Sequence, residues 1–158
     1  FANGALEAQN LGLNKTKPVL RHGKEPVIKY TSSKRESVME IYNVVEEIRK
    51  EGKHSIAIIT KTFKEAKVLE KDIKRYTNLE YTIIKGNEKS APSTDVVIIP
   101  VYLTKGLEFD GTIIYNPLES VYENNLLNQR LLYVGLTRAL HYEYIIAEGK
   151  LSQNIKTN

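Results

Sequence analysis

Two short runs of β-branched residues constrain the fold of this chain more than any other feature. They occupy residues 55–60 (SIAIIT) and 95–101 (DVVIIPV), and both are almost continuously apolar. A strand without a polar side has to be covered on both faces, as the strands of parallel sheets are. The two runs therefore predict buried strands of a parallel sheet that lies between layers of helix.

The rest of the chain alternates between helical and strand patterns. Apolar residues at helical spacing predict helices over about 33–51, 63–76 and 126–140, with Ser33 as an N-cap and Gly52 as a stop signal. Further strands are predicted over 27–30, 81–84, 111–115 and 142–147. Alternation of this kind predicts an α/β fold with a mainly parallel sheet and helices on both faces.

Chain length and the distribution of glycine and proline predict one folded domain. The 158 residues can bury one hydrophobic core. Residues 1–26 lack periodicity and are interrupted by glycine and proline, so we expect a lead-in there and a domain over 27–158. The chain begins at Phe1 and not at methionine. We therefore expect it to be a piece of a longer protein.

Composition excludes several kinds of site. The chain has no cysteine, and its three histidines (His22, His54 and His141) are too far apart for a local zinc pattern, so no metal site is predicted. No apolar run approaches membrane-spanning length, and we expect a cytoplasmic protein. The net charge of +4 suits a polyanionic partner, although lysines such as Lys61 and Lys64 are typical of a solvated helix face.

The first segment that could carry chemistry is residues 100–110 (PVYLTKGLEFD). In open α/β sheets ligands bind beyond the carboxyl ends of the strands, and this segment leaves the most apolar strand. Pro100 is expected to end that strand and Gly106 to allow a turn. Glu108 then stands at a strand terminus, with Leu107 and Phe109 as apolar anchors; the alternative is a solvated glutamate in a crossover turn.

The second segment is residues 129–141 (QRLLYVGLTRALH), predicted on the last helix. One helix face is apolar, and the other carries Arg130, Thr137, Arg138 and His141. A guanidinium on a rigid helix suits an arginine finger, because its planar donors stabilise the charge on a transferred γ-phosphoryl group. An ordinary surface helix with solvated arginine is the alternative.

Together the two segments resemble two helicase motifs. Residues 104–110 (TKGLEFD) resemble motif V, and residues 130–139 (RLLYVGLTRA) resemble motif VI, of the UvrD/Rep family of superfamily 1 helicases. Residues 56–62 (IAIITKT) look like the strand and turn that precede these motifs. The resemblance covers about residues 27–148 and implies the second RecA-like domain of such a helicase, a fold of the P-loop NTPase type.

The resemblance also implies roles for individual residues. Arg138 matches the motif VI arginine that reaches the γ-phosphate of ATP, and Glu108 matches the motif V glutamate that contacts the nucleotide sugar. Lys105 and Gly106 match the turn that places Glu108. Tyr102 matches a position at which many members have a histidine that touches single-stranded nucleic acid, and Thr104 is expected to contact the nucleic acid as well.

Other positions depart from the family pattern. Pro100 replaces the usual threonine, and Asn128 and Gln129 replace the acidic pair that often opens motif VI. Tyr102 and residues 103–110 (LTKGLEFD) look more similar to the HelD branch, whose members associate with RNA polymerase, than to UvrD itself. An RNA polymerase-remodelling ATPase of bacterial type is therefore a second hypothesis, and a non-catalytic nucleic-acid-binding module is a third.

Parts of a complete ATPase are missing from the sequence. No G-x-x-x-x-G-K-[ST] motif occurs, so the fold is predicted without its P-loop. None of the three aspartates lies in an acidic magnesium-binding motif. The resemblance thus implies that ATP and Mg²⁺ are held by a first motor domain, with single-stranded DNA as a further partner. We expect this chain alone to be inactive.

Overall fold

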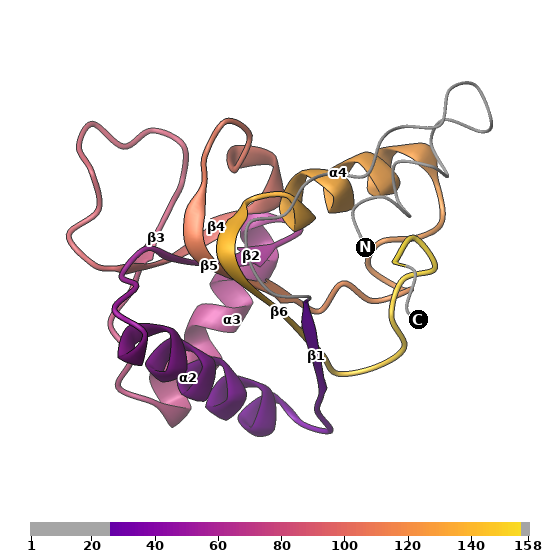
Figure 1. Ribbon diagram of the computed structural model, residues 1–158. Coiled ribbons are helices and arrows are strands. Elements are labelled where there is room, and N and C mark those ends of the chain that lie inside the picture. Colours follow the sequence, from indigo (N-terminus) through magenta and orange to yellow (C-terminus); the bar gives the residue numbers. More distant parts are fainter. Residues whose placement is uncertain (1–25, 156–158) are drawn as a thin grey trace.

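The computed structural model describes residues 26–155, which form a six-stranded sheet flanked by helices (Figure 1). The lead-in predicted for residues 1–26 lies, apart from Pro26, outside the described residues. Neighbouring strands follow the order β1-β6-β5-β2-β4-β3, and every pair is parallel. The strands are β1 (Val27–Tyr30), β2 (Ile56–Thr60), β3 (Thr82–Ile83), β4 (Val96–Pro100), β5 (Phe109–Tyr115) and β6 (Ala139–Ala147).

The two apolar runs form β2 and β4, next to each other in the sheet. All five residues of each strand are buried, which confirms that these strands are covered on both faces. Their register pairs Ile56 with Val96 and Thr60 with Pro100. The ladder stops at Pro100, as predicted, because proline has no N–H to donate.

Helices cover both faces of the sheet (Figure 1). The helices α2 (Lys34–Lys50) and α3 (Phe63–Tyr76) lie on one face, and α4 (Leu126–Leu136) lies on the other beside the short 3₁₀ helix η1 (Val101–Leu103). Ser33 caps α2 by accepting a hydrogen bond from the main-chain N–H of Glu36. The fold class predicted from the sequence is therefore confirmed.

Four predicted elements had wrong boundaries. The last helix ends at Leu136 instead of residue 140, and β6 begins at Ala139 because Ala139 pairs with Phe109 in the parallel ladder. For the same reason β5 begins at Phe109, two residues before the predicted start. The strand expected over 81–84 is only Thr82–Ile83. Within the part of the chain described here, no helix is long and apolar enough to cross a membrane.

Candidate functional site

The two motif segments meet at the amino edge of the sheet, where its parallel strands begin. Ile56, at the start of β2, pairs with both Val96 of β4 and Gly111 of β5. β5 therefore starts at the edge opposite to the one where β4 ends at Pro100. Residues 101–108, which we call the crossing segment, run from the carboxyl edge of the sheet to its amino edge.

Tyr102 lies at the carboxyl edge, directly after β4. It is the middle residue of η1, and its side chain is 55% exposed. The placement agrees with the expectation that functional side chains follow strands at this edge. Glu108 does not follow that expectation, because it directly precedes β5 at the amino edge.

Thr104 is a residue of the crossing segment whose side chain points into the protein. The residue is fully buried, and its hydroxyl donates a 2.7 Å hydrogen bond to the carbonyl oxygen of Val101. Its own N–H donates to the same oxygen at 3.0 Å. Thr104 thus holds the turn after η1, and its contact with nucleic acid stays a prediction.

Lys105 and Gly106 form the exposed turn that the sequence predicted. Gly106 has φ of +83°, in the left-handed region that glycine adopts without steric strain. The N–H of Leu107 closes the turn by donating to the carbonyl oxygen of Thr104 at 2.9 Å. The turn delivers Glu108 to the start of β5.

Glu108 is exposed and lies between two different neighbours. Phe109 is buried, as expected of an anchor, whereas Leu107 is 43% exposed and does not anchor the turn. Within residues 26–155 the carboxylate of Glu108 has no ion-pair or hydrogen-bond partner. It is therefore free to accept hydrogen bonds from a ligand.

Arg138 is not on the helix where the sequence placed it. It lies two residues after the end of α4 and directly before β6, and it is half-buried. Its guanidinium has three protein acceptors: Nε donates to the carbonyl oxygen of Val134 at 2.9 Å, Nη2 to the hydroxyl of Thr137 at 3.1 Å, and Nη1 to the carbonyl oxygen of Leu107 at 3.3 Å. No carboxylate pairs with it in the described part of the chain.

Main-chain pairing joins the two motif segments. The N–H of Phe109 donates to the carbonyl oxygen of Arg138 at 2.9 Å, while the side chain of Arg138 reaches Leu107. Both neighbours of Glu108 thus contact Arg138, so the exposed Glu108 lies at the same edge of the sheet as a guanidinium that has no acidic partner within residues 26–155. This pair can bind a ligand that has both hydroxyl and anionic groups.

Lys61 makes contacts that the sequence did not reveal. It lies in the turn before α3 and not on a solvated helix face, and its Nζ donates to the carbonyl oxygen of Val121 at 2.7 Å. The ammonium is also 5.4 Å from the centre of the ring of Tyr122. No local pattern predicts a contact between residues sixty positions apart.

The two amides that open motif VI hold the loop before α4. Asn128 and Gln129 are both buried. Asn128 Nδ2 donates to the carbonyl oxygen of Glu123 at 2.9 Å, and Gln129 Nε2 donates to Asn124 Oδ1 at 3.3 Å. These side chains therefore tie the start of α4 to the loop before it.

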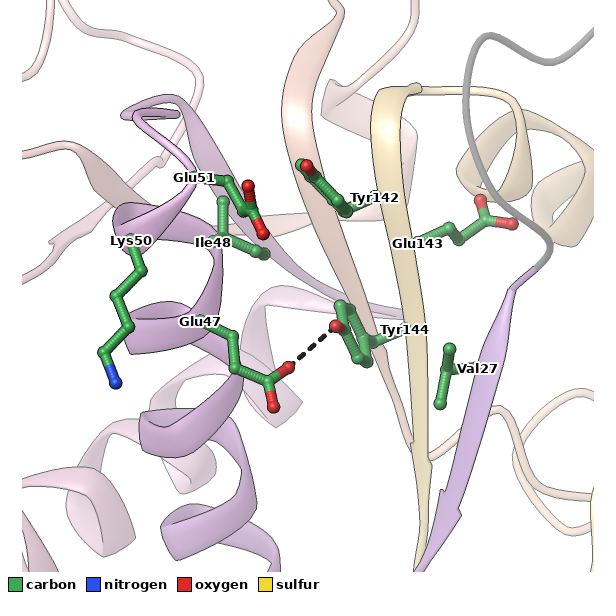
Figure 2. A pocket seen from close by; sticks show the side chains of 8 residues that line it. All are labelled: Val27, Glu47, Ile48, Lys50, Glu51, Tyr142, Glu143 and Tyr144. Atoms are coloured by element: carbon green, nitrogen blue, oxygen red, sulfur yellow. Dashed lines mark hydrogen bonds between the residues drawn. The ribbon is translucent and has the colours of Figure 1, made fainter.

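A pocket of about 250 Å³ lies elsewhere, between α2 and β6 (Figure 2). Tyr142 and Tyr144 point toward α2, whereas Glu143 points to the other side of β6. The hydroxyl of Tyr144 donates to Glu47 at 2.9 Å, and burial together with this carboxylate raises the pKa of Tyr144 to about 12. None of the predicted site residues lines this pocket.

Residues 26–155 contain no group of three or more acidic or histidine side chains that could hold a metal ion.

Comparisons with known proteins agree with this arrangement. Residues 95–146, which include both segments, match the family described as the UvrD-like helicase C-terminal domain. The structure is similar to that of the C-terminal domain of a possible DNA helicase from Lactobacillus plantarum WCFS1, with a TM-score of 0.75 and 28% identity over 96% of this chain and 86% of that one. No curated protein matches the sequence.

Two more distant structures share the fold alone. One is the SWI2/SNF2 ATPase core of Sulfolobus solfataricus in complex with double-stranded DNA, with a TM-score of 0.57 and 9% identity over 78% of this chain and 28% of that one. The other is the UvsW helicase of bacteriophage T4, with a TM-score of 0.55 and 11% identity over 92% and 51% of the two chains.

Proposed function

We propose that this chain is the carboxyl-terminal motor domain of an ATP-dependent DNA helicase or translocase, because residues 95–146 match the family of UvrD-like helicase C-terminal domains. In this proposal Arg138 is the arginine finger, Glu108 contacts the ribose of ATP, and Tyr102 is part of the single-strand track. The observation that carries it is the hydrogen bond between Phe109 and Arg138, which brings Glu108 and Arg138 together at the amino edge.

The amino edge offers one group for the phosphoryl-transfer step and one for binding the nucleotide. As the bond to the γ-phosphoryl group breaks, negative charge builds on its oxygens, and a fixed guanidinium stabilises that charge. Arg138 has no acidic partner within residues 26–155, so its full charge is available to the phosphate. The exposed carboxylate of Glu108 can accept hydrogen bonds from ribose hydroxyls.

The phosphate cradle and the magnesium ligands would come from a first motor domain. The sequence has no P-loop of its own, so ATP would bind between the amino edge of this domain and that partner. When bound, Mg²⁺ neutralises charge on the β- and γ-phosphates. It follows from this proposal that the isolated chain neither hydrolyses ATP nor binds it tightly.

The carboxyl edge supplies a surface for the nucleic acid. The exposed ring of Tyr102 can stack on a base, an interaction that tolerates any base sequence. The net charge of +4 favours a polyanionic partner. The crossing segment connects Tyr102 with Glu108 through only five intervening residues. A movement of Tyr102 at the carboxyl edge would therefore also move Glu108 at the amino edge.

The test is ATP turnover by the complete protein with saturating single-stranded DNA. We expect Arg138→Ala to lower kcat by on the order of 10³ or more, with the free energy of unfolding nearly unchanged. Arg138→Lys should restore little, because an ammonium lacks the planar pair of donors. Turnover close to wild type in the alanine variant would show that Arg138 is not the finger.

A further inference from the structure

Thr137 connects the end of α4 with the guanidinium of Arg138. Its hydroxyl donates to the carbonyl oxygens of Tyr133 at 2.9 Å and Val134 at 3.1 Å, which share its one hydrogen. The same oxygen accepts a 3.1 Å hydrogen bond from Nη2 of Arg138. Thr137 is therefore anchored to the helix on one side and holds the arginine on the other.

The three hydrogen bonds of the Arg138 guanidinium leave some of its N–H donors available for a ligand. A guanidinium has five N–H groups: one on Nε and two on each terminal nitrogen. Val134, Leu107 and Thr137 each take one of them. Each terminal nitrogen thus keeps one N–H that can donate to a phosphoryl oxygen.

We infer that Thr137 is a positioning residue, whose hydroxyl fixes the Arg138 guanidinium so that its two remaining donors face the phosphate. This inference rests on the proposed function. Of the three acceptors that hold the guanidinium, only Thr137 uses a side chain, since Val134 and Leu107 contribute carbonyl oxygens. Thr137 is therefore the one contact that substitution can remove without touching the arginine.

The experiment measures ATP turnover by the complete protein with saturating oligothymidine. Thr137→Val keeps the shape of the side chain and removes the hydroxyl. We expect kcat to fall about tenfold, the effect of one hydrogen bond to a charged group, and KM for ATP to stay within about twofold. Thr137→Ser retains the hydroxyl and should keep kcat within about twofold of wild type.

A matched control separates positioning from helix capping. Thr77 is the C-cap of α3 as Thr137 is of α4, and its hydroxyl also donates to the carbonyl oxygen four residues earlier at 2.9 Å. No arginine lies next to Thr77 in the sequence. Thr77→Val should therefore lower the melting temperature about as much as Thr137→Val and leave kcat unchanged.

Combining substitutions shows whether Thr137 acts through Arg138. In an Arg138→Ala background we expect Thr137→Val to have no further effect on kcat, because the group that it positions is gone. An equal loss in both backgrounds, or an equal loss in Thr77→Val, would overturn the positioning role. A normal kcat in Thr137→Val beside a large loss in Arg138→Ala would overturn it too, with the proposed function intact. A normal kcat in Arg138→Ala would overturn both.

Discussion

The main-chain N–H of Phe109 donates a 2.9 Å hydrogen bond to the carbonyl oxygen of Arg138. This contact joins residues twenty-nine positions apart, where β5 and β6 begin. Because main-chain pairing in a sheet has a fixed spacing, the position of Glu108 relative to Arg138 does not depend on flexible side chains.

Replacing Glu108 by alanine should weaken ATP binding more than it slows the chemical step. The carboxylate is exposed and would contact the sugar, which does not change during phosphoryl transfer. We expect KM for ATP to rise about tenfold, with kcat within about threefold of wild type. Steady-state kinetics on the complete protein measure both values.

Asp110 is a suitable control for Glu108, since it is a second carboxylate at the same edge, 3.9 Å from Nε2 of His141. Asp110→Asn should leave KM for ATP near the wild-type value. If Glu108→Ala also left KM unchanged, the ribose contact would be wrong.

Replacing Tyr102 by alanine should weaken binding of single-stranded DNA. The ring is 55% exposed, so its loss should reduce affinity by about 1–3 kcal/mol if it stacks on a base, with ATP affinity barely altered. Tyr102→Phe keeps the ring and should bind normally. Fluorescence anisotropy with labelled oligothymidine measures the affinity at constant salt.

Tyr30 provides the matched control for Tyr102, because it is 63% exposed and ends β1, the outermost strand on the other side of the sheet. Tyr30→Ala should leave single-strand affinity unchanged. Full affinity in Tyr102→Ala would exclude the ring from the track. A fall in melting temperature with normal affinity would favour a structural role instead.

Replacing Gly106 by alanine should strain the turn that delivers Glu108. At φ of +83° a side chain is unfavourable by about 1 kcal/mol, and no atom lies within 4 Å of the added Cβ, so the loss is purely conformational. Urea unfolding of the chain should show this loss, and Gly106→Asn should show less of it.

Gly52 has nearly the same backbone conformation, with φ of +78° and open space around its Cβ position, but lies at the end of α2. Gly52→Ala should therefore lose similar stability. Of the two alanine variants, only Gly106→Ala should raise KM for ATP. An equal rise in both would indicate that global stability, and not the turn, determines KM.

The Arg49–Asp95 ion pair should make part of the stability depend on pH. Arg49 donates from Nε and Nη2 to the two oxygens of Asp95 at 3.0 and 2.7 Å, and these bonds lower the pKa of Asp95 below its usual value. Because the pKa of Asp95 is lower in the folded chain than in the unfolded chain, the ion pair stabilises the fold at pH values above about 3.9, the pKa of an aspartate in an unfolded chain. That stability is lost as the pH falls through the pKa of Asp95 in the folded chain.

We therefore expect Asp95→Asn to lower the free energy of unfolding by about 1 kcal/mol near pH 7, and this difference from wild type to shrink below about pH 4. Urea unfolding across this range measures the difference. Glu119→Gln, in an exposed pair with Lys150, should change stability little at any pH. A difference for Asp95→Asn that stays constant down to pH 2 would contradict the ionic origin of the effect.

Local sequence patterns were sufficient to predict most elements of the fold. The ranges of α2 and α3 agree with the predicted helices within a residue, because their caps and apolar spacing are local signals. β2 and β4 were recognised because continuous β-branched runs are typical of strands covered on both faces. The predicted turn at Gly106 was correct for the same kind of reason, since the conformation of a glycine turn depends on few neighbours.

The sequence by itself determined the fold class and which residues are candidates for chemistry, because hydrophobic periodicity and short motifs depend only on residues that are close together in the sequence. Only the tertiary structure decided that Arg138 precedes a strand, that Thr104 is buried, and that Tyr102 and Glu108 lie at opposite edges of the sheet. The sequence around Arg138 has a helical pattern, but the main chain there pairs with β5. The N–H of Phe109 donates to the carbonyl oxygen of Arg138, and the two residues are distant in sequence. Such pairing depends on which strands become neighbours, and that relationship exists only once the whole chain has folded.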